Sequence, residues 1–208
     1  PAAYSHLYLS IDGELAAVIC IHDPLRREAR DAVAALHACG IGKVVMMTGD
    51  NRQTAQAVAR EVGVDAVYAE VLPEDKAAFI RSEKAAGHTV IMVGDGVNDS
   101  PALSEADAGV AISTGAAIAR EIADITIASE DLFELVTLRR LSQALMARIH
   151  RNYRFIVGFN LSLILLGVAG LLPPTTSALL HNASTLGISL DSMTDLLDKE
   201  KECKEPEA

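Results

Sequence analysis

The feature that most constrains this chain is an uncharged apolar run over residues 155–172, FIVGFNLSLILLGVAGLL. Twelve of its 18 residues are Phe, Ile, Leu or Val. On an insertion scale such residues contribute about −0.3 to −0.6 kcal/mol each, which outweighs the single Asn160. As a helix the run would be about 27 Å long, close to the thickness of a bilayer core. The run therefore predicts the first helix of a membrane hairpin.

A second, less apolar segment follows the run and would complete the hairpin. Pro173-Pro174 should end the first helix, and residues 175–197 are the candidate for the return span. Arginines favour the cytoplasmic side of a span, and five precede the run: Arg139, Arg140, Arg148, Arg151 and Arg154. We expect a linking helix over 129–154, a transmembrane hairpin over 155–197 and an acidic cytoplasmic tail over 198–208. The alternative is a buried core helix in a soluble domain.

The composition narrows the partners of the chain. Half of its residues are hydrophobic, and its formal net charge is −10. Such an acidic balance argues against nucleic acid as a partner. The three cysteines, Cys20, Cys39 and Cys203, form no Cys-x-x-Cys pair, so neither a disulfide framework nor a zinc knuckle is indicated. This pattern fits a reducing cytosol.

Residues 1–128 alternate between strand and helix patterns. Asp12-Gly13 separates two apolar runs, as a hairpin turn would. Asp23-Pro24 predicts the start of a helix that ends near Cys39. Further strands and helices then alternate, with strands at 43–47, 66–69 and 89–93 and helices at 52–62 and 73–86. This order implies a parallel sheet covered by helices, with the functional site beyond the carboxyl ends of its strands.

Two short motifs at strand ends or helix starts carry groups suited to phosphate. Thr48-Gly49-Asp50-Asn51 offers a hydroxyl and backbone amides that could hold a phosphoryl oxygen, although the same residues could form only a helix cap and a turn. Lys76, in the motif Pro73–Lys76, could neutralise a phosphoryl group. A surface lysine on a first helical turn is the plainer interpretation of Lys76 taken alone.

A third loop, residues 94–101, is more specific. Asp95 and Asp99 lie four residues apart, directly after an apolar strand. Mg²⁺ takes hard oxygen ligands, usually one or two carboxylates together with phosphate oxygens. Asn98 can donate to a phosphate oxygen. The loop predicts a site for magnesium and phosphate, and a turn rich in turn-forming residues is the alternative.

Together these motifs resemble those of P-type ATPases. VGDGVNDSPAL, residues 93–103, resembles the hinge signature of that family. MTGDN at 47–51 and Pro-x-x-Lys at 73–76 resemble two further motifs of its phosphorylation domain, in the same order. The resemblance implies that residues 1–128 are the C-terminal portion of a phosphorylation (P) domain. Its fold would be α/β, an incomplete parallel sheet of haloacid-dehalogenase-like (Rossmann-like) type.

The resemblance also implies a role for each motif residue. Asp95 and Asp99 would bind Mg²⁺. The phosphoryl group would be held, balanced in charge or hydrogen-bonded by Thr48, Gly49, Asp50, Lys76 and Asn98.

The nucleophile that the resemblance implies is an aspartate in an Asp-Lys-Thr-Gly-Thr motif, which ATP converts to an aspartyl-phosphate. That motif does not occur in the 208 residues. In the family it precedes the nucleotide-binding domain, so the chain alone is expected to be inactive. Residues 9–15 imitate the start of a small phosphatase of this fold, but Ser10 stands where its nucleophilic aspartate would be. A hairpin turn at Asp12-Gly13 is the preferred interpretation.

The end of the chain resembles the heavy-metal branch of the family, which closes with two helices. The residues that would contact the transported cation are Asn160, His181, Asn182 and Ser184. An imidazole suits zinc-like ions, and Met193 is the only sulfur-containing residue of the hairpin, so a divalent cation is favoured over copper. A polar stripe recurs along the second helix and could equally serve helix packing: Ser177, His181, Thr185, Ser189 and Ser192.

The sequence thus predicts part of an ATP-driven heavy-metal pump, an enzyme when intact, in a bacterial plasma membrane. Residues 1–154 and the tail would be cytoplasmic. Its partners would be the metal cation, the lipid bilayer and the N-terminal part of the same pump, with Mg²⁺ as cofactor and ATP as substrate. Two alternatives stay open: a membrane-anchored haloacid-dehalogenase-like phosphatase, and a non-catalytic regulatory pseudo-ATPase.

Overall fold

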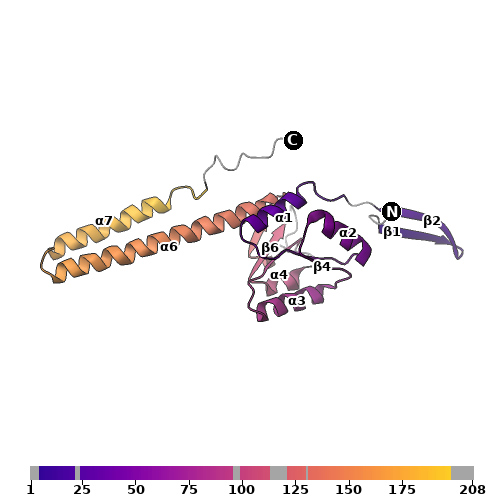
Figure 1. The fold of residues 1–208 in the computed structure, drawn as a ribbon, viewed down its shortest axis with the longest axis horizontal. Helices are drawn as coiled ribbons and strands as arrows, with labels where there is room; N and C mark the ends of the chain where they lie inside the picture. Colours follow the sequence, from indigo (N-terminus) through magenta and orange to yellow (C-terminus); the bar gives the residue numbers. More distant parts are fainter. Residues whose placement is uncertain (1–4, 22–23, 96–98, 113–120, 130, 198–208) are drawn as a thin grey trace. The chain divides into compact units, whose positions relative to one another are not determined.

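The structure is a computed structural model that describes residues 5–21, 24–95, 99–112, 121–129 and 131–197 (Figure 1). The chain divides into two compact units, residues 1–136 and residues 137–208, and each is considered by itself. The first unit contains every strand of the described residues. The second contains most of one long helix and all of another.

The first two strands form an antiparallel hairpin. β1 (Ser5–Ile11) pairs with β2 (Glu14–Ile21), and Asp12 and Gly13 make the turn with φ values of 52° and 85°. Positive φ at both central residues is the requirement of a tight turn that matches strand twist, and Asp-Gly meets it well. The predicted hairpin is confirmed.

The remaining strands are parallel, as the sequence predicts. β3 (Val45–Met47) pairs with β4 (Ala66–Tyr68), and β6 (Ala108–Ile112) lies between β5 (Ile91–Gly94) and β7 (Ile125–Ile127). Within the described residues these strands form two separate sections, because no ladder joins β3 or β4 to β5, β6 or β7. The single sheet expected from the sequence is therefore present as two pieces.

Two helices begin and end where their caps predict. α2 (Arg52–Val62) starts after Asn51, whose side chain accepts a hydrogen bond from the backbone N–H of Thr54 at 3.0 Å, and it stops at Gly63. α3 (Pro73–Ala85) has Pro73 at its first position, where the missing N–H costs nothing. Local residues thus account for both ends of α2 and for the start of α3.

The first helix was predicted to begin too early. α1 (Ala29–Ala38) starts several residues after Pro24, and residues 27–28 form a turn instead. No side chain caps this helix, and its start coincides with its first buried residues, Ala29, Ala32 and Val33. Packing rather than capping determines where the helix begins, since most helical stability comes from the buried face.

The core of the first unit lies around a short helix. α4 (Ser100–Glu105) packs against β5, β6 and α3 and buries Ala102 and Leu103. Val110 and Ala111 of β6 are also fully buried. At Gly109 a Cβ atom would stand 2.7 Å from the carbonyl oxygen of Leu103, so only glycine allows this close packing of strand and helix. This core sets the position of the loop between β5 and α4.

The second unit is built on two helices that run antiparallel side by side (Figure 1). α6 (Phe133–Val168) joins the predicted linking helix and the first predicted span in one helix, and α7 (Pro174–Ser192) is the return. α6 ends before the apolar run does, because Gly170 adopts φ 73° and the N–H of Leu171 bonds to the carbonyl of Leu166 at 3.0 Å. Among the helices of the described residues, none combines the length and the apolar character that a membrane crossing requires.

Candidate functional site

Two predicted site residues meet in an ion pair. The ammonium Nζ of Lys76 lies 2.7 Å from Oδ1 of Asp99, and their side chains are only 15% and 14% exposed. Lys76 stands in the first turn of α3, and Asp99 is the residue directly before α4. The packing of α3 against α4 brings these two helix starts together. A largely enclosed pair of opposite charges can serve an ion or a phosphoryl group.

Asp99 is also pressed against the end of β5. A Cβ atom at Gly94 would stand 2.7 Å from Oδ2 of Asp99 and 3.0 Å from its Cβ. The absence of a side chain at Gly94 is therefore what lets the carboxylate lie against the strand end. Asp99 is thus held on two sides, by Lys76 and by the backbone of β5.

The Thr48 loop is closed by its own side chains. The hydroxyl of Thr48 donates to Oδ2 of Asp50 at 2.7 Å and accepts from the backbone N–H of Asp50 at 3.1 Å. The N–H of Thr48 donates to the carbonyl of Tyr68 at 3.0 Å, which ties the loop to the end of β4. Three of the predicted residues, Thr48, Gly49 and Asp50, therefore form one ordered turn after β3.

This turn is bonded to the segment that leads into α3. The N–H of Val71 donates to the carbonyl of Thr48 at 3.0 Å, and the N–H of Glu70 donates to the carbonyl of Asp50 at 2.9 Å. Glu70 has φ 58°, a left-handed conformation that non-glycine residues rarely adopt. The Thr48 turn and the helix that carries Lys76 are thus linked through the three residues Glu70, Val71 and Leu72. Glu70 was not predicted from the sequence, because a glutamate gives no signal for a left-handed turn.

The remaining predicted residues of this site are less defined. Asp95 is exposed and takes part in an electrostatic or hydrogen-bonding interaction. Asn98 lies outside the described residues. The structure therefore brings Lys76 and Asp99 together and orders the Thr48 turn.

Two carboxylates away from these loops have lowered pKa values. The pKa of Glu83 is below its usual range, because Lys43 and His88 hydrogen-bond to its carboxylate. The pKa of Asp107 is also lowered, mainly because the backbone N–H of Val90 donates to it at 2.8 Å. Glu83 ties α3 to the segment before β3, and Asp107 ties the segment before β6 to the segment before β5.

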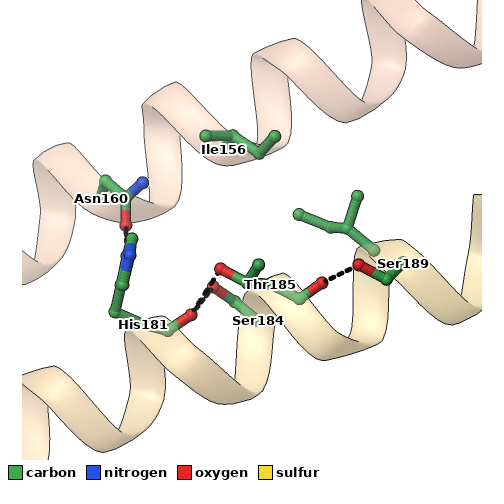
Figure 2. A pocket seen from close by; sticks show the side chains of 7 residues that line it. Ile156, Asn160, His181, Ser184, Thr185 and Ser189 are labelled. Atoms are coloured by element: carbon green, nitrogen blue, oxygen red, sulfur yellow. Dashed lines mark hydrogen bonds between the residues drawn. The ribbon is translucent and has the colours of Figure 1, made fainter.

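In the second unit, Asn160 of α6 and His181 of α7 point toward each other (Figure 2). Nδ1 of His181 lies 2.8 Å from Oδ1 of Asn160. With Nδ1–H as donor to this amide oxygen, Nε2 keeps its lone pair. The two residues border a small open cavity of about 120 Å³, lined by Ile156, Asn160, His181, Ser184, Thr185, Ile188 and Ser189. Of the four predicted cation contacts, Asn182 is the one that does not line it.

The hydroxyls around this cavity are bonded to their own helix. Ser184 and Thr185 donate to the carbonyl of His181 at 2.8 and 3.0 Å, and Ser189 donates to the carbonyl of Thr185 at 2.9 Å (Figure 2). Such back-bonding is common for hydroxyls within helices. Their protons are directed to the backbone, so only oxygen lone pairs remain for a ligand.

Comparison with known proteins decides the family. The haloacid dehalogenase-like hydrolase family matches residues 2–107. This chain belongs to that family. The match covers the parallel strands β3, β4 and β5, the Thr48 turn, Lys76 and Asp99. The α/β fold with a parallel sheet, predicted from the sequence, is thereby confirmed.

Over most of its length this haloacid dehalogenase-like chain is also homologous to heavy-metal P-type ATPases. Copper-transporting ATPase 2 of Rhizobium meliloti (strain 1021) is 46% identical over 176 residues, 85% of this chain and 21% of that protein. A manganese-exporting P-type ATPase of Mycobacterium bovis (strain ATCC BAA-935 / AF2122/97) is 41% identical over 191 residues, 91% of this chain and 27% of that protein. The chain therefore spans only about a quarter of these relatives.

A solved structure has the same fold over nearly the whole chain. The crystal structure of a zinc-transporting PIB-type ATPase in the E2.Pi state matches with a TM-score of 0.81 at 29% identity. The match covers 92% of this chain and 31% of that one. The resemblance to P-type ATPases stated from the motifs is confirmed.

The haloacid dehalogenase-like site has a donor set that fits Mg²⁺. Within the described residues no three His, Cys, Asp or Glu side chains gather as a metal cluster. Mg²⁺ does not need such a cluster, because it uses one or two carboxylates and takes its other ligands from water and phosphate. The carboxylate of Asp99, held against Gly94, is of the required kind.

Proposed function

We propose that this chain is part of an ATP-driven pump for a heavy-metal cation, which works through an aspartyl-phosphate. The observation that carries the proposal is the Lys76–Asp99 pair at the end of β5, within 2.7 Å, in a chain homologous to copper and manganese ATPases. Phosphoryl transfer relies mainly on positioning and on charges placed around the transferred group. The helix and strand ends described above supply such charges on a rigid support.

Each loop then has one task. Lys76 neutralises charge on the phosphoryl oxygens. When the phosphoryl group binds, the Thr48 hydroxyl turns its proton from Asp50 to one of those oxygens, beside the amide of Gly49. Asp99, together with Asp95, holds Mg²⁺, which supplies charge neutralisation and orientation when bound. Asn98 donates a hydrogen bond to the phosphoryl group. The bonds from Glu70 and Val71 to the Thr48 turn keep that turn and Lys76 at a fixed separation.

The nucleophilic aspartate belongs, in this proposal, to a strand outside the 208 residues. β3 and β5 each have one edge with no partner strand among the described residues. A strand placed between them would join the two parallel sections into one sheet. Its carboxyl end would then lie beside those of β3 and β5, where Thr48 and Asp99 stand. The alternative, a phosphatase, needs a carboxylate at position 10. Ser10 has none, and it lies in β1, an antiparallel strand outside the parallel sections.

The pair of helices α6 and α7 is the proposed membrane hairpin and cation path. The apolar side chains of α6 between Phe155 and Val168 are largely exposed, as lipid-facing side chains would be. Residues 1–154 and the tail would lie in the cytoplasm of a bacterium. His181, with Nε2 free, and Asn160 would contact the cation. A zinc-like divalent ion is favoured over copper, because Met193, the one thioether of residues 155–197, does not line the cavity.

The test uses the intact protein that contains this chain, in membrane vesicles with radiolabelled ATP. We expect an acid-stable phosphoenzyme whose amount depends on zinc, cadmium, cobalt or copper, with zinc-like ions the most effective. Asp99→Asn should lower phosphoenzyme turnover at least tenfold, on the order of one lost charge-assisted contact. His181→Ala should reduce the metal dependence and leave the protein folded and inserted.

The matched control is Asp31→Asn, an exposed aspartate in the first turn of α1, which should change neither quantity. A phosphoenzyme that responds to none of the four metals would refute the pump. If metal dependence is unchanged in His181→Ala, the polar stripe of α7 serves helix packing and does not bind the cation.

A further inference from the structure

A feature outside the residues assigned so far is the contact of Arg148 with the end of α7. Its Nη1 donates to the carbonyl oxygens of Ser192 at 3.3 Å and Thr194 at 2.7 Å. Its Nη2 donates to Oγ1 of Thr194 at 3.1 Å and to the carbonyl oxygen of Asp195 at 2.9 Å. One guanidinium on α6 therefore binds four acceptors at the end of the neighbouring helix.

One of these acceptors, the Ser192 carbonyl, belongs to the last turn of α7, and the other three lie on Thr194 and Asp195, just beyond the helix. The last carbonyl groups of a helix have no partner within it, and they form the negative end of its dipole. α7 ends at Ser192, and Met193 after it is right-handed, without the left-handed glycine that often closes a helix. The N–H groups of Met193 and Thr194 donate to the carbonyls of Leu190 and Asp191, and Arg148 reaches the Ser192 carbonyl. The five donors of an arginine, fixed in one plane, suit several carbonyls at once. Arg148 thus caps α7 from the other helix.

Two further contacts lie beside this cap. Nη2 of Arg151 is 2.7 Å from Oδ2 of Asp191, and Nδ2 of Asn152 is 3.4 Å from Oγ of Ser192. The Arg151 and Asp191 side chains are 60% and 46% exposed, so solvent weakens their attraction. The multiple bonds of Arg148 are the stronger link at this end of the hairpin.

The contacts between the helices follow one face of α6. Four residues recur at intervals of four and so share that face: Arg148, Asn152, Ile156 and Asn160. On α7 and just beyond its end, their counterparts come in reverse order, as expected for antiparallel helices: Thr194, Ser192, Ile188 and His181. The cavity lies between the Arg148 cap at one end and the Asn160–His181 contact at the other.

Apolar packing does little to fix this register. α7 has no buried residue, and in the described part of 137–197 only Leu163 is a buried hydrophobic residue. A slip of α7 by one residue would move it by about 1.5 Å and turn its side chains by about 100°. Such a slip would carry His181 away from Asn160.

We propose that Arg148 is a positioning residue that sets the register of α7 against α6. It thereby holds His181 against Asn160 across the cavity. The register itself is a property of the hairpin, whereas its importance for the cation rests on the proposed function. The test therefore has one structural readout and one functional readout.

The structural readout is disulfide formation in the 208-residue chain, in detergent micelles, with Cys20, Cys39 and Cys203 replaced by serine. Ile156→Cys with Ile188→Cys reports the observed register, and Ile156→Cys with Gly187→Cys reports a slip of one residue. We expect the first pair to dominate. Arg148→Ala should lower the ratio of the two yields about tenfold, the factor that corresponds to about 1.4 kcal/mol.

Two variants keep this test decisive. Arg148→Lys retains the charge and loses the planar fork, so it should give an intermediate ratio. Arg140→Ala removes an exposed arginine of the same helix and should leave the ratio unchanged. An unchanged ratio in Arg148→Ala, with helix content preserved by circular dichroism, would overturn the proposal. If that variant does not fold, an unchanged ratio in Arg148→Lys would overturn it.

The functional readout is zinc-stimulated phosphoenzyme formation in the intact pump. Arg148→Lys should raise the zinc concentration for half-stimulation about threefold while the maximal level stays close to that of the native protein, because a misplaced His181 weakens binding first. If the native protein shows no metal response but the register of the hairpin depends on Arg148, the pump is refuted and the role of Arg148 is supported. If the native protein responds to metal and the register is the same without Arg148, the role of Arg148 is refuted and the pump is supported.

Discussion

At the residue scale, the site depends on side chains that are far apart in sequence. Lys76 and Asp99 are separated by 23 residues and meet within 2.7 Å. Each is held by local structure, Lys76 by the first turn of α3 and Asp99 by the space that Gly94 leaves open. Their pairing is a tertiary effect of α3 on α4.

The Lys76–Asp99 pair should contribute to stability as a coupled unit. Lys76→Met and Asp99→Asn should each lower the free energy of unfolding by about 2 kcal/mol, because each leaves a largely enclosed charge without its partner. The double variant should lose clearly less than the sum of the two. Urea unfolding of the 208-residue chain, followed by circular dichroism, measures all three; additive losses would show that the pair is not coupled.

Gly94 should tolerate no side chain. Gly94→Ala places a Cβ atom 2.7 Å from Oδ2 of Asp99, so the carboxylate must move and its bond to Lys76 must lengthen. We expect a loss of about 1–3 kcal/mol, as for other overpacked sites. Gly42→Ala is the control, because no atom lies within 4 Å of a Cβ there. Equal unfolding midpoints for the two variants would contradict the close approach.

At the element scale, the sequence predicts some boundaries well and others poorly. α2 and α3 match their predictions because Asn51, Gly63 and Pro73 act locally. The start of α1 does not follow from the cap-like Asp23-Pro24, since burial of its alanines decides it. The end of α6 depends on the left-handed turn at Gly170. This end could not be predicted, because the apolar run continues past it. The Thr48 turn was predictable from its motif, whereas its link to Glu70 was not.

Asp107 should make the first unit sensitive to acid. It joins the start of β6 to β5 and α3, through Val90 and Lys84. Because these partners lower its pKa, its contribution is fully present above the usual aspartate value of about 3.9 and is lost as pH falls through the lower folded value. Asp107→Asn should therefore flatten the fall in unfolding midpoint below about pH 4. A slope in Asp107→Asn identical to that of the native protein would exclude Asp107 as a source.

At the scale of the whole molecule, the proposed function gives the chain the supporting groups of a reaction and places the nucleophile elsewhere. The Asp-Lys-Thr-Gly-Thr motif is absent from its 208 residues. The phosphate motifs could be found in the sequence because each is short and local, and the family could be predicted from those motifs. The division of the sheet into two sections was not, because strand pairing depends on segments distant in the chain.

The purified 208-residue chain should hydrolyse no ATP, because loss of the nucleophile removes the covalent route. Phosphate release in the presence of Mg²⁺ should equal that of a sample without protein. Release that exceeds this background and disappears in Asp95→Ala would contradict the expectation and favour the phosphatase alternative. Lys43→Ala, a change outside the phosphate loops, controls for contaminating activity.

The cavity between α6 and α7 has a lining without formal charge, since it is made of an amide, an imidazole, three hydroxyls and two isoleucines. Neutral dipoles can orient toward a cation and leave its charge uncancelled. A divalent ion that passes through this cavity would therefore carry both of its charges with it. In a membrane each charge responds to the electrical potential by about 2.3 kcal/mol per 100 mV. The turnover of the intact pump should accordingly vary with membrane voltage, and each cycle should register as an electrical current.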